Sequence, residues 1–252
     1  MKVFSVYGFT DTGKTTVVET LIHHLKKKRY TVGSIKEIHY ERFKIDTPGS
    51  NTERHRIQGA DPVTARGYSE TDVMYGQKLS LLEILAHYHQ DFVVCEGVTD
   101  YNLPKILTAK TMEELEERWE FGVFAISGRI ASQLGSTYRG VPVINVLTHP
   151  ELLCDLVLEK VFELLPDVDT ACCNACGYGC RGLTDQILKG KASRDDCIQQ
   201  NRRVDLIING QAIPMVPFVE TILRNTCLGV VKSLDGYRPN TTIEIKLNER
   251  IT

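Results

Sequence analysis

The sequence lacks both a long apolar run and a strong charge of either sign. No uninterrupted apolar stretch approaches the roughly 18 residues needed to cross a bilayer, and the N-terminus has the pattern of a strand rather than of a basic, apolar leader. The formal net charge is -2, which gives no electrostatic footprint for nucleic acid or an anionic membrane. We therefore expect a soluble cytoplasmic protein that binds neither.

Internal repeats and low-complexity tracts are also absent, and 252 residues can bury one large core or a core plus a small appendage. Strand-like apolar runs alternate with helical patterns up to about residue 165. The expected strands are 2–7, 31–38, 91–97, 121–126 and 141–146, and the expected helices are 17–25, 79–86 and 151–165. This order predicts an α/β fold, a P-loop NTPase-like, doubly wound and mostly parallel sheet over 1–165, with its ligand outside the carboxyl ends of the strands.

The remaining third of the chain has a different pattern. Pro166 marks a boundary, after which we expect a four-cysteine module over 166–200 and a small α+β tail over 201–252. The tail is predicted to hold strands at 204–208 and 241–247 around a helix at 217–232.

The most informative motif directly follows the first apolar run. Gly8-Phe9-Thr10-Asp11-Thr12-Gly13-Lys14-Thr15-Thr16 has the form G-x-x-x-x-G-K-[ST] between a strand and a helix, which disfavours an ordinary glycine-rich turn. The two glycines let backbone N–H groups point at phosphate oxygens, Lys14 can reach the β- and γ-phosphates, and Thr15 can ligate Mg²⁺. The predicted nucleotide-binding residues are Gly8, Thr10, Asp11, Thr12, Gly13, Lys14, Thr15 and Thr16.

A carboxylate ends the buried strand at 91–96. Glu96 is predicted to face the Mg²⁺ and the phosphates, because acidic residues at such strand ends do so in nucleoside triphosphatases; the alternative is that it only caps a loop. The polar segment 39–67, with Asp46 and Arg54, follows the second strand, where switch loops and substrate contacts tend to lie.

Eight cysteines are many for a reduced compartment, and four of them have metal-ligand spacing. Cys173-x2-Cys176-x3-Cys180-x16-Cys197 predicts three thiolates on one tight turn and a fourth from beyond a short helix at 183–190. The spacing favours a [4Fe–4S] cluster over tetrahedral Zn²⁺, and it resembles the small four-cysteine domain of electron-transfer and corrinoid iron–sulfur proteins. Cys172 could replace Cys173. Cys95, Cys154 and Cys227 lie in apolar sequence and are expected to act as small hydrophobes.

Several short motifs together resemble the MobB family, the molybdopterin-guanine dinucleotide biosynthesis protein B group, over residues 1 to about 165. They are Gly8 to Thr16, Ile35-Lys36, His39, Ile45-Asp46-x-Pro48-Gly49, Arg54, Gly59-Ala60, Glu96-Gly97 and Pro104-Lys105-Ile106. The resemblance implies a homodimeric P-loop protein that binds GTP with Mg²⁺ near Glu96 and assists molybdenum or tungsten cofactor assembly. It also implies a switch stretch that contains Asp46 and Arg54.

The chain departs from the family pattern beside the site. It has Lys36-Glu37 where a Lys-His pair is usual, and Ser50-Asn51-Thr52 where Lys-Asp-Ser is usual. It has no Asn/Thr-Lys-x-Asp sequence, so GTP is distinguished from ATP only by the resemblance.

The favoured function is that of a GTP-binding accessory protein with weak GTPase activity, coupled to a cysteine-ligated cluster. Lys14, Asp46 and Glu96 are the expected catalytic residues, with Arg54 on the nucleotide. Its expected partners are molybdenum or tungsten cofactor assembly enzymes or a client metalloenzyme. The alternatives are an Fe–S carrier or electron-transfer maturation factor, and a small-molecule kinase in which Lys14 and Arg54 clamp phosphates; an Arg-rich lid, which would favour the kinase, is absent from the sequence.

Overall fold

The computed structural model describes residues 1–40, 43–166, 173, 176–197, 204, 206–209, 211–213, 215, 217–235, 237 and 243–245. Its strands are β1 (Lys2–Tyr7), β2 (Val32–Lys36), β3 (Val63–Arg66), β4 (Thr71–Met74), β5 (Phe92–Glu96), β6 (Lys105–Thr108), β7 (Val123–Ser127), β8 (Thr137–Tyr138), β9 (Val141–Pro142), β10 (Leu206–Ile208) and β11 (Gln211–Ile213). Its helices are α1 (Lys14–Lys27), α2 (Asn51–Ile57), α3 (Leu81–Leu85), α4 (Met112–Glu117), α5 (Pro150–Lys160), α6 (Gly179–Leu188) and α7 (Pro217–Val231), with short 3₁₀ turns at Arg129–Ser132 and Arg194–Asp196.

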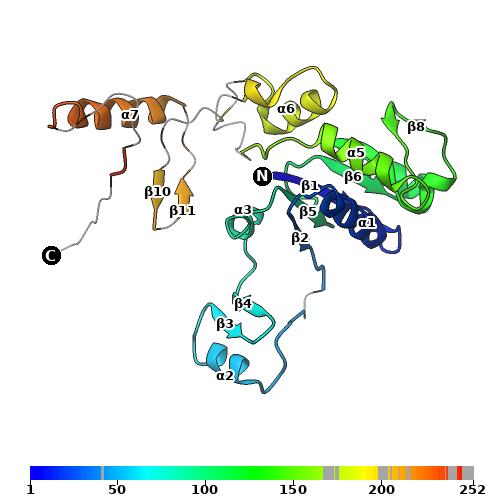
Figure 1. The fold of residues 1–252 in the computed structure, drawn as a ribbon, viewed down its shortest axis with the longest axis horizontal. Coiled ribbons are helices and arrows are strands. Elements are labelled where there is room, and N and C mark those ends of the chain that lie inside the picture. The colour runs from blue at the N-terminus through cyan, green and yellow to red at the C-terminus, as the bar shows by residue number, and fades with distance from the viewer. Residues whose placement is uncertain are drawn as a thin grey trace.

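Five parallel strands form the central sheet in the order β2-β5-β1-β6-β7 (Figure 1). This arrangement confirms the predicted α/β class. The register pairs Val6 of β1 with Glu96 of β5, and Glu96 in turn with Lys36 of β2. The carboxyl ends of these three strands therefore meet at one edge, beside the loop that follows β1.

Both faces of the sheet are covered, and β1 shows how its side chains divide between them. Phe4 and Val6 join a core with the buried residues of α1 and α5, whereas Val3 packs in a second core with Leu85 of α3. Tyr7 belongs to a third core, with Leu115 of α4. Because successive side chains of a strand point to opposite faces, a continuous apolar run is what a strand buried on both sides requires.

Two predictions for this domain were wrong, and one strand was missed. The expected strand at 141–146 is reduced to the two-residue β9, paired with β8, plus a single bridge between Val143 and Ile126. The buried strand β6 was not predicted, because it is only four residues long and starts with a lysine after Pro104. Helix α5 ends at Lys160, and Glu163 beyond it makes an antiparallel bridge with Lys2.

The polar segment after β2 forms an arm that projects away from the sheet (Figure 1). It carries α2 and the β3–β4 hairpin. The side chain of Ser50 caps α2 by accepting a hydrogen bond from the backbone N–H of Glu53 at 3.0 Å. All residues of α2 are exposed or half-buried, whereas Val63 of β3 is buried, so the packing within the arm centres on the hairpin.

The C-terminal third is described only in part. Helix α6 begins at Gly179, four residues before its predicted start, and its Leu183 packs against Leu165. Strands β10 and β11 form a hairpin, and α7 confirms the predicted helix at 217–232. Of the strand predicted at 241–247, residues 243–245 are described and lie outside any strand; the others fall outside the described residues. None of the helices in the described part of the chain is long and apolar enough to cross a membrane.

Candidate nucleotide-binding site

The loop between β1 and α1 has a backbone shape that needs its glycines. Gly8 has φ +147° and Gly13, which caps α1, has φ +97°. A Cβ on Gly8 would lie 2.0 Å from the carbonyl oxygen of Thr108, so no larger residue fits there. Thr12 is buried beneath the loop, where its hydroxyl is 2.7 Å from that of Thr108. These contacts fix the loop with its N–H groups at the N-terminus of α1, a geometry that favours anions.

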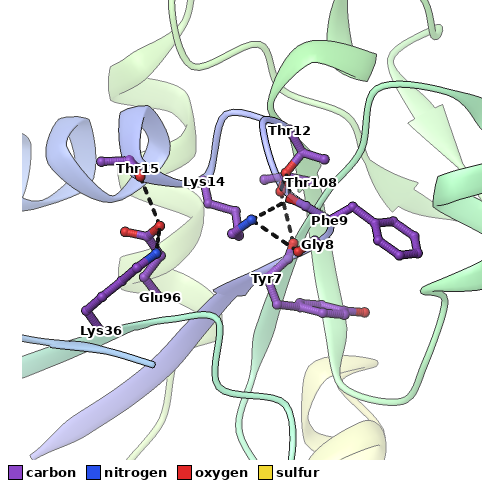
Figure 2. A network of polar contacts seen from close by, with 9 residues as sticks. All are labelled: Tyr7, Gly8, Phe9, Thr12, Lys14, Thr15, Lys36, Glu96 and Thr108. Atoms are coloured by element: carbon purple, nitrogen blue, oxygen red, sulfur yellow. Dashed lines mark hydrogen bonds and ion pairs between the residues drawn. The ribbon is translucent and has the colours of Figure 1, made fainter. Parts of the chain in front are cut away.

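Lys14 lies across this loop. Its ammonium donates to the carbonyl of Gly8 at 3.1 Å and to that of Phe9 at 2.5 Å (Figure 2). Burial lowers the pKa of the Lys14 ammonium, and the nearby charge of Lys36 lowers that pKa further. Among the residues that the structure describes, no carboxylate is hydrogen-bonded to this cation, so it is available to phosphate oxygens.

Three side chains meet beside the first turn of α1. One carboxylate oxygen of Glu96, Oε1, accepts a hydrogen bond from the hydroxyl of Thr15 at 2.9 Å and forms an ion pair with the ammonium of Lys36 (Figure 2). Glu96 is 7% exposed, which confirms the buried strand end predicted from sequence. A hydroxyl and a carboxylate at this distance are the oxygen donors that Mg²⁺ uses.

A cavity of about 810 Å³ opens in front of these groups. Four cations line it, namely Lys14, Lys36, Arg118 and Arg129, together with the carboxylates of Asp11, Glu37 and Glu96. The guanidinium of Arg118 lies over the ring of Phe9, 4.2 Å from its centroid. The size and the cationic lining suit a polyphosphate ligand.

The structure brings most of the predicted nucleotide residues together. The cavity is lined by Gly8, Thr10, Asp11, Gly13, Lys14, Thr15, Thr16 and Glu96. Sequence reasoning did not identify Arg118 and Arg129 as site residues, and Lys36 was quoted only as part of a family motif. For Lys36 the signal was its position near the carboxyl end of the strand predicted at 31–38, which a parallel sheet places at the ligand edge.

Asp46 and Arg54 lie elsewhere. Among the residues that the structure describes, neither lines this cavity: Arg54 lines a separate hollow of about 390 Å³ along α2, and Asp46 lies in the arm. The Asp46 carboxylate accepts hydrogen bonds from the hydroxyls of Ser50 at 2.7 Å and Thr52 at 2.8 Å, and these bonds lower the pKa of Asp46. In this arrangement Asp46 stabilises the turn before α2.

The cysteines of the predicted cluster are partly separated. Cys197 is buried and packs with Cys176 against Leu165 and Leu183, while Cys180 lies in the first turn of α6 rather than on the predicted tight turn. Cys173 is half-buried, and Cys172 lies outside the described residues. In the described part of the chain, no three His, Cys, Asp or Glu side chains are placed to hold a metal ion. The four-thiolate site is therefore not assembled here.

The three remaining cysteines differ in their burial. Cys95 and Cys154 are buried hydrophobes, as predicted, and Cys227 is half-buried.

Comparison with known proteins agrees with this geometry. Residues 3–126 match the family model of MobB, Molybdopterin guanine dinucleotide synthesis protein B. A protein of Methanocaldococcus jannaschii described as a putative molybdopterin-guanine dinucleotide biosynthesis adapter protein is 27% identical over 98% of this chain and 98% of its own length. A probable adapter protein of the same kind from Bacillus subtilis is 24% identical and covers 63% of this chain.

Solved structures share the fold. The crystal structure of Bacillus subtilis MobB has a TM-score of 0.54 at 22% identity, and it covers 65% of this chain and 100% of its own. The bacterial relatives thus match about two thirds of this chain, whereas the archaeal relative is similar along nearly all of it. Residues 3–126 of this chain are thus similar to the MobB family model, and the N-terminal domain shares its fold with Bacillus subtilis MobB.

Proposed function

We propose that this protein is a GTP-binding adapter in the biosynthesis or insertion of the molybdopterin guanine dinucleotide cofactor. The observation that carries the proposal is the site at the β1–α1 loop, where the Lys14 ammonium, the loop amides and the Thr15–Glu96 pair face one cavity. The family match and the descriptions of both relatives support the biosynthetic role.

The residues present suit Mg²⁺ with a nucleoside triphosphate. Thr15 and Glu96 would hold the ion, which when bound supplies positive charge to the β- and γ-phosphates. Lys14 would bind the terminal phosphates and offset the charge that develops when water attacks the γ-phosphate in line. We expect slow hydrolysis, because Asp46, which was expected to position water or metal, does not line the described cavity.

The arm provides the switch and the dimer contact in this proposal. Asp46 and Arg54 would reach the nucleotide only after the arm moves, so GTP-driven ordering of the arm would control delivery of the cofactor to a partner enzyme. Exposed apolar side chains of the arm, among them Ile45, Ile57 and Val73, would pack in a homodimer. Light scattering after size exclusion, with and without GTP, tests the dimer.

Calorimetric titration tests which nucleotide the protein binds and whether Lys14 contributes to the affinity. GTP with Mg²⁺ should bind more tightly than ATP, and Lys14→Ala should weaken binding at least tenfold, since a charge-assisted contact to phosphate is lost. Lys26→Ala is the matched control, because it removes an exposed cation from the last turn of the same helix. Phosphate release should be slow for the isolated protein and rise with a partner enzyme; rapid turnover by the protein alone would contradict the adapter role.

A second proposal concerns Cys173, Cys176, Cys180 and Cys197, which would bind a [4Fe–4S] cluster, with Zn²⁺ as the alternative. It is supported by their spacing and by the packing of Cys176 and Cys197 in one cluster. In the described part of the chain, the thiols as they stand do not fit a metal ion.

Anaerobic purification with iron, sulfide and zinc analysis decides the second proposal. A brown protein that loses its colour in Cys176→Ser but not in Cys227→Ser would support a cluster, and stoichiometric zinc a structural site. If Lys14→Ala left client activation intact while Cys176→Ala abolished it, the protein would be an Fe–S carrier rather than a GTP-dependent adapter.

A further inference from the structure

Lys36 forms an ion pair with Glu96 in the candidate nucleotide site. The register pairs Lys36 of β2 with Glu96 of β5, so the two side chains leave the sheet on the same face, at the carboxyl ends of their strands. Its ammonium contacts Glu96 Oε1, the same oxygen that accepts the Thr15 hydroxyl (Figure 2). The cation therefore lies where the oxygen donors for Mg²⁺ converge.

The side chains of Lys36 and Glu96 differ in how strongly their surroundings restrict them. The side chain of Glu96 is 9% exposed and is fixed from two sides, whereas that of Lys36 is 52% exposed. A long, half-exposed lysine side chain can turn to another partner at small cost, but the buried carboxylate cannot. If the pair opens, it is therefore Lys36 that moves.

The groups around Lys36 favour a movement of its side chain toward the cavity. Lys36 and Lys14 line the same cavity, and the positive charge of Lys36 lowers the pKa of Lys14. The neighbouring carboxylate of Glu37 is paired with Lys78 at 2.7 Å. A triphosphate on Lys14 would add several negative charges to this cavity and would attract a freed ammonium.

We propose that Lys36 is a second phosphate-binding lysine, which pairs with Glu96 as seen in this structure and would turn to the terminal phosphate in the complex with nucleotide and Mg²⁺. Glu96 and Thr15 would hold the ion, whose charge would repel the ammonium, and the terminal phosphate would be its new partner. Lys36 would thus make the site sensitive to the terminal phosphate. This inference rests on the proposed nucleotide binding.

The test compares GDP with a non-hydrolysable GTP analogue by calorimetry in the presence of Mg²⁺. Lys36→Met should lower the preference for the triphosphate about tenfold, since one charge-assisted contact to that phosphate is lost. Lys36→Arg should retain most of the preference. Lys78→Met is the matched control, because it removes a nearby cation that pairs with Glu37 and should leave the preference unchanged.

The binding results can be interpreted if the variants have melting temperatures close to that of the wild-type protein. Equal losses of GDP and analogue affinity in Lys36→Met would overturn the inference, because Lys36 would then only neutralise Glu96. An unchanged preference would also overturn it, while leaving the proposed function intact. Wild-type protein that binds neither nucleotide would overturn the proposed function itself.

Discussion

Breaking the buried ion pair of Lys105 and Glu120 should destabilise the protein. The loss should differ according to which of the two residues is replaced. The side chain of Lys105 is 0% exposed, and its ammonium lies 2.9 Å from Glu120 Oε1, whose side chain is 29% exposed. The ammonium also lies 4.2 Å from the centroid of the Phe121 ring and 3.4 Å from the carbonyl of Thr99, a residue of the cavity wall. Burial lowers the pKa of Lys105.

The magnitude follows from these distances. At 2.9 Å the Coulomb attraction between the two charges is ~6 kcal/mol at an effective dielectric constant of about 20, and the cost of desolvating them offsets part of it. Glu120→Gln keeps a hydrogen-bond acceptor but leaves a fully buried cation, so the free energy of unfolding should fall by about 3 to 4 kcal/mol. Lys105→Met keeps the apolar stem and leaves a carboxylate whose Oε1 is buried but whose side chain is 29% exposed, so the loss should be smaller, about 1 to 3 kcal/mol.

Urea unfolding followed by the fluorescence of Trp119, the one tryptophan of the sequence and the neighbour of Glu120, measures both variants. The double variant should lose less than the sum of the two, because no charge is left unpaired. Since the folded-state pKa of Lys105 lies below its unfolded value, the penalty in Glu120→Gln is full at low pH and should shrink as pH rises toward 10. Equal losses, or losses below about 0.5 kcal/mol in both, would refute this reasoning.

Three further predictions concern other parts of the molecule. Gly8→Ala should reduce nucleotide affinity at least tenfold, because the new Cβ would lie 2.0 Å from the Thr108 carbonyl oxygen. Gly135→Ala is the control, because a Cβ there meets open space and should leave the affinity unchanged. Equal affinities of the two variants in calorimetric titrations would contradict this prediction. Burial raises the pKa of the Cys95 thiol from 9.0 to about 12. The thiol therefore ionises at lower pH in the unfolded chain, and the free energy of unfolding should fall by up to about 1.4 kcal/mol per pH unit above pH 9. Urea titrations of Cys95→Ala should show a flatter dependence on pH. Leu183→Ala should cost about 2 to 5 kcal/mol through the cavity left against Leu165, and an unchanged melting temperature would show that α6 does not dock there.

Sequence reasoning succeeded where the signal is local. The loop from Gly8 to Thr16 carries its own glycines and lysine, and the apolar run that ends at Glu96 shows that a carboxylate ends a buried strand. The strand order of the sheet then places both at one edge. Fold class and phosphate loop were therefore predictable from short segments.

It failed where contacts join distant segments. The pairing of Lys36 with Glu96 depends on the β2–β5 register, and the approach of Arg118 to the loop depends on how the chain returns after β6. Asp46 was expected to be a catalytic residue, but the chain after β2 leaves the sheet and forms the arm, where Asp46 bonds to Ser50 (Figure 1). The four cysteines gave a spacing, which does not fix the distances between thiols in the folded chain.

A crystal structure grown with Mg²⁺ and a non-hydrolysable GTP analogue would show whether the β1–α1 loop binds nucleotide. We expect the β- and γ-phosphates on the amides of residues 10–15, with the Lys14 ammonium turned from the carbonyls of Gly8 and Phe9 to phosphate oxygens and a magnesium ion on Thr15 and Glu96. An analogue bound elsewhere, or a loop that stays empty at saturating analogue with Lys14 still on its carbonyls, would contradict it.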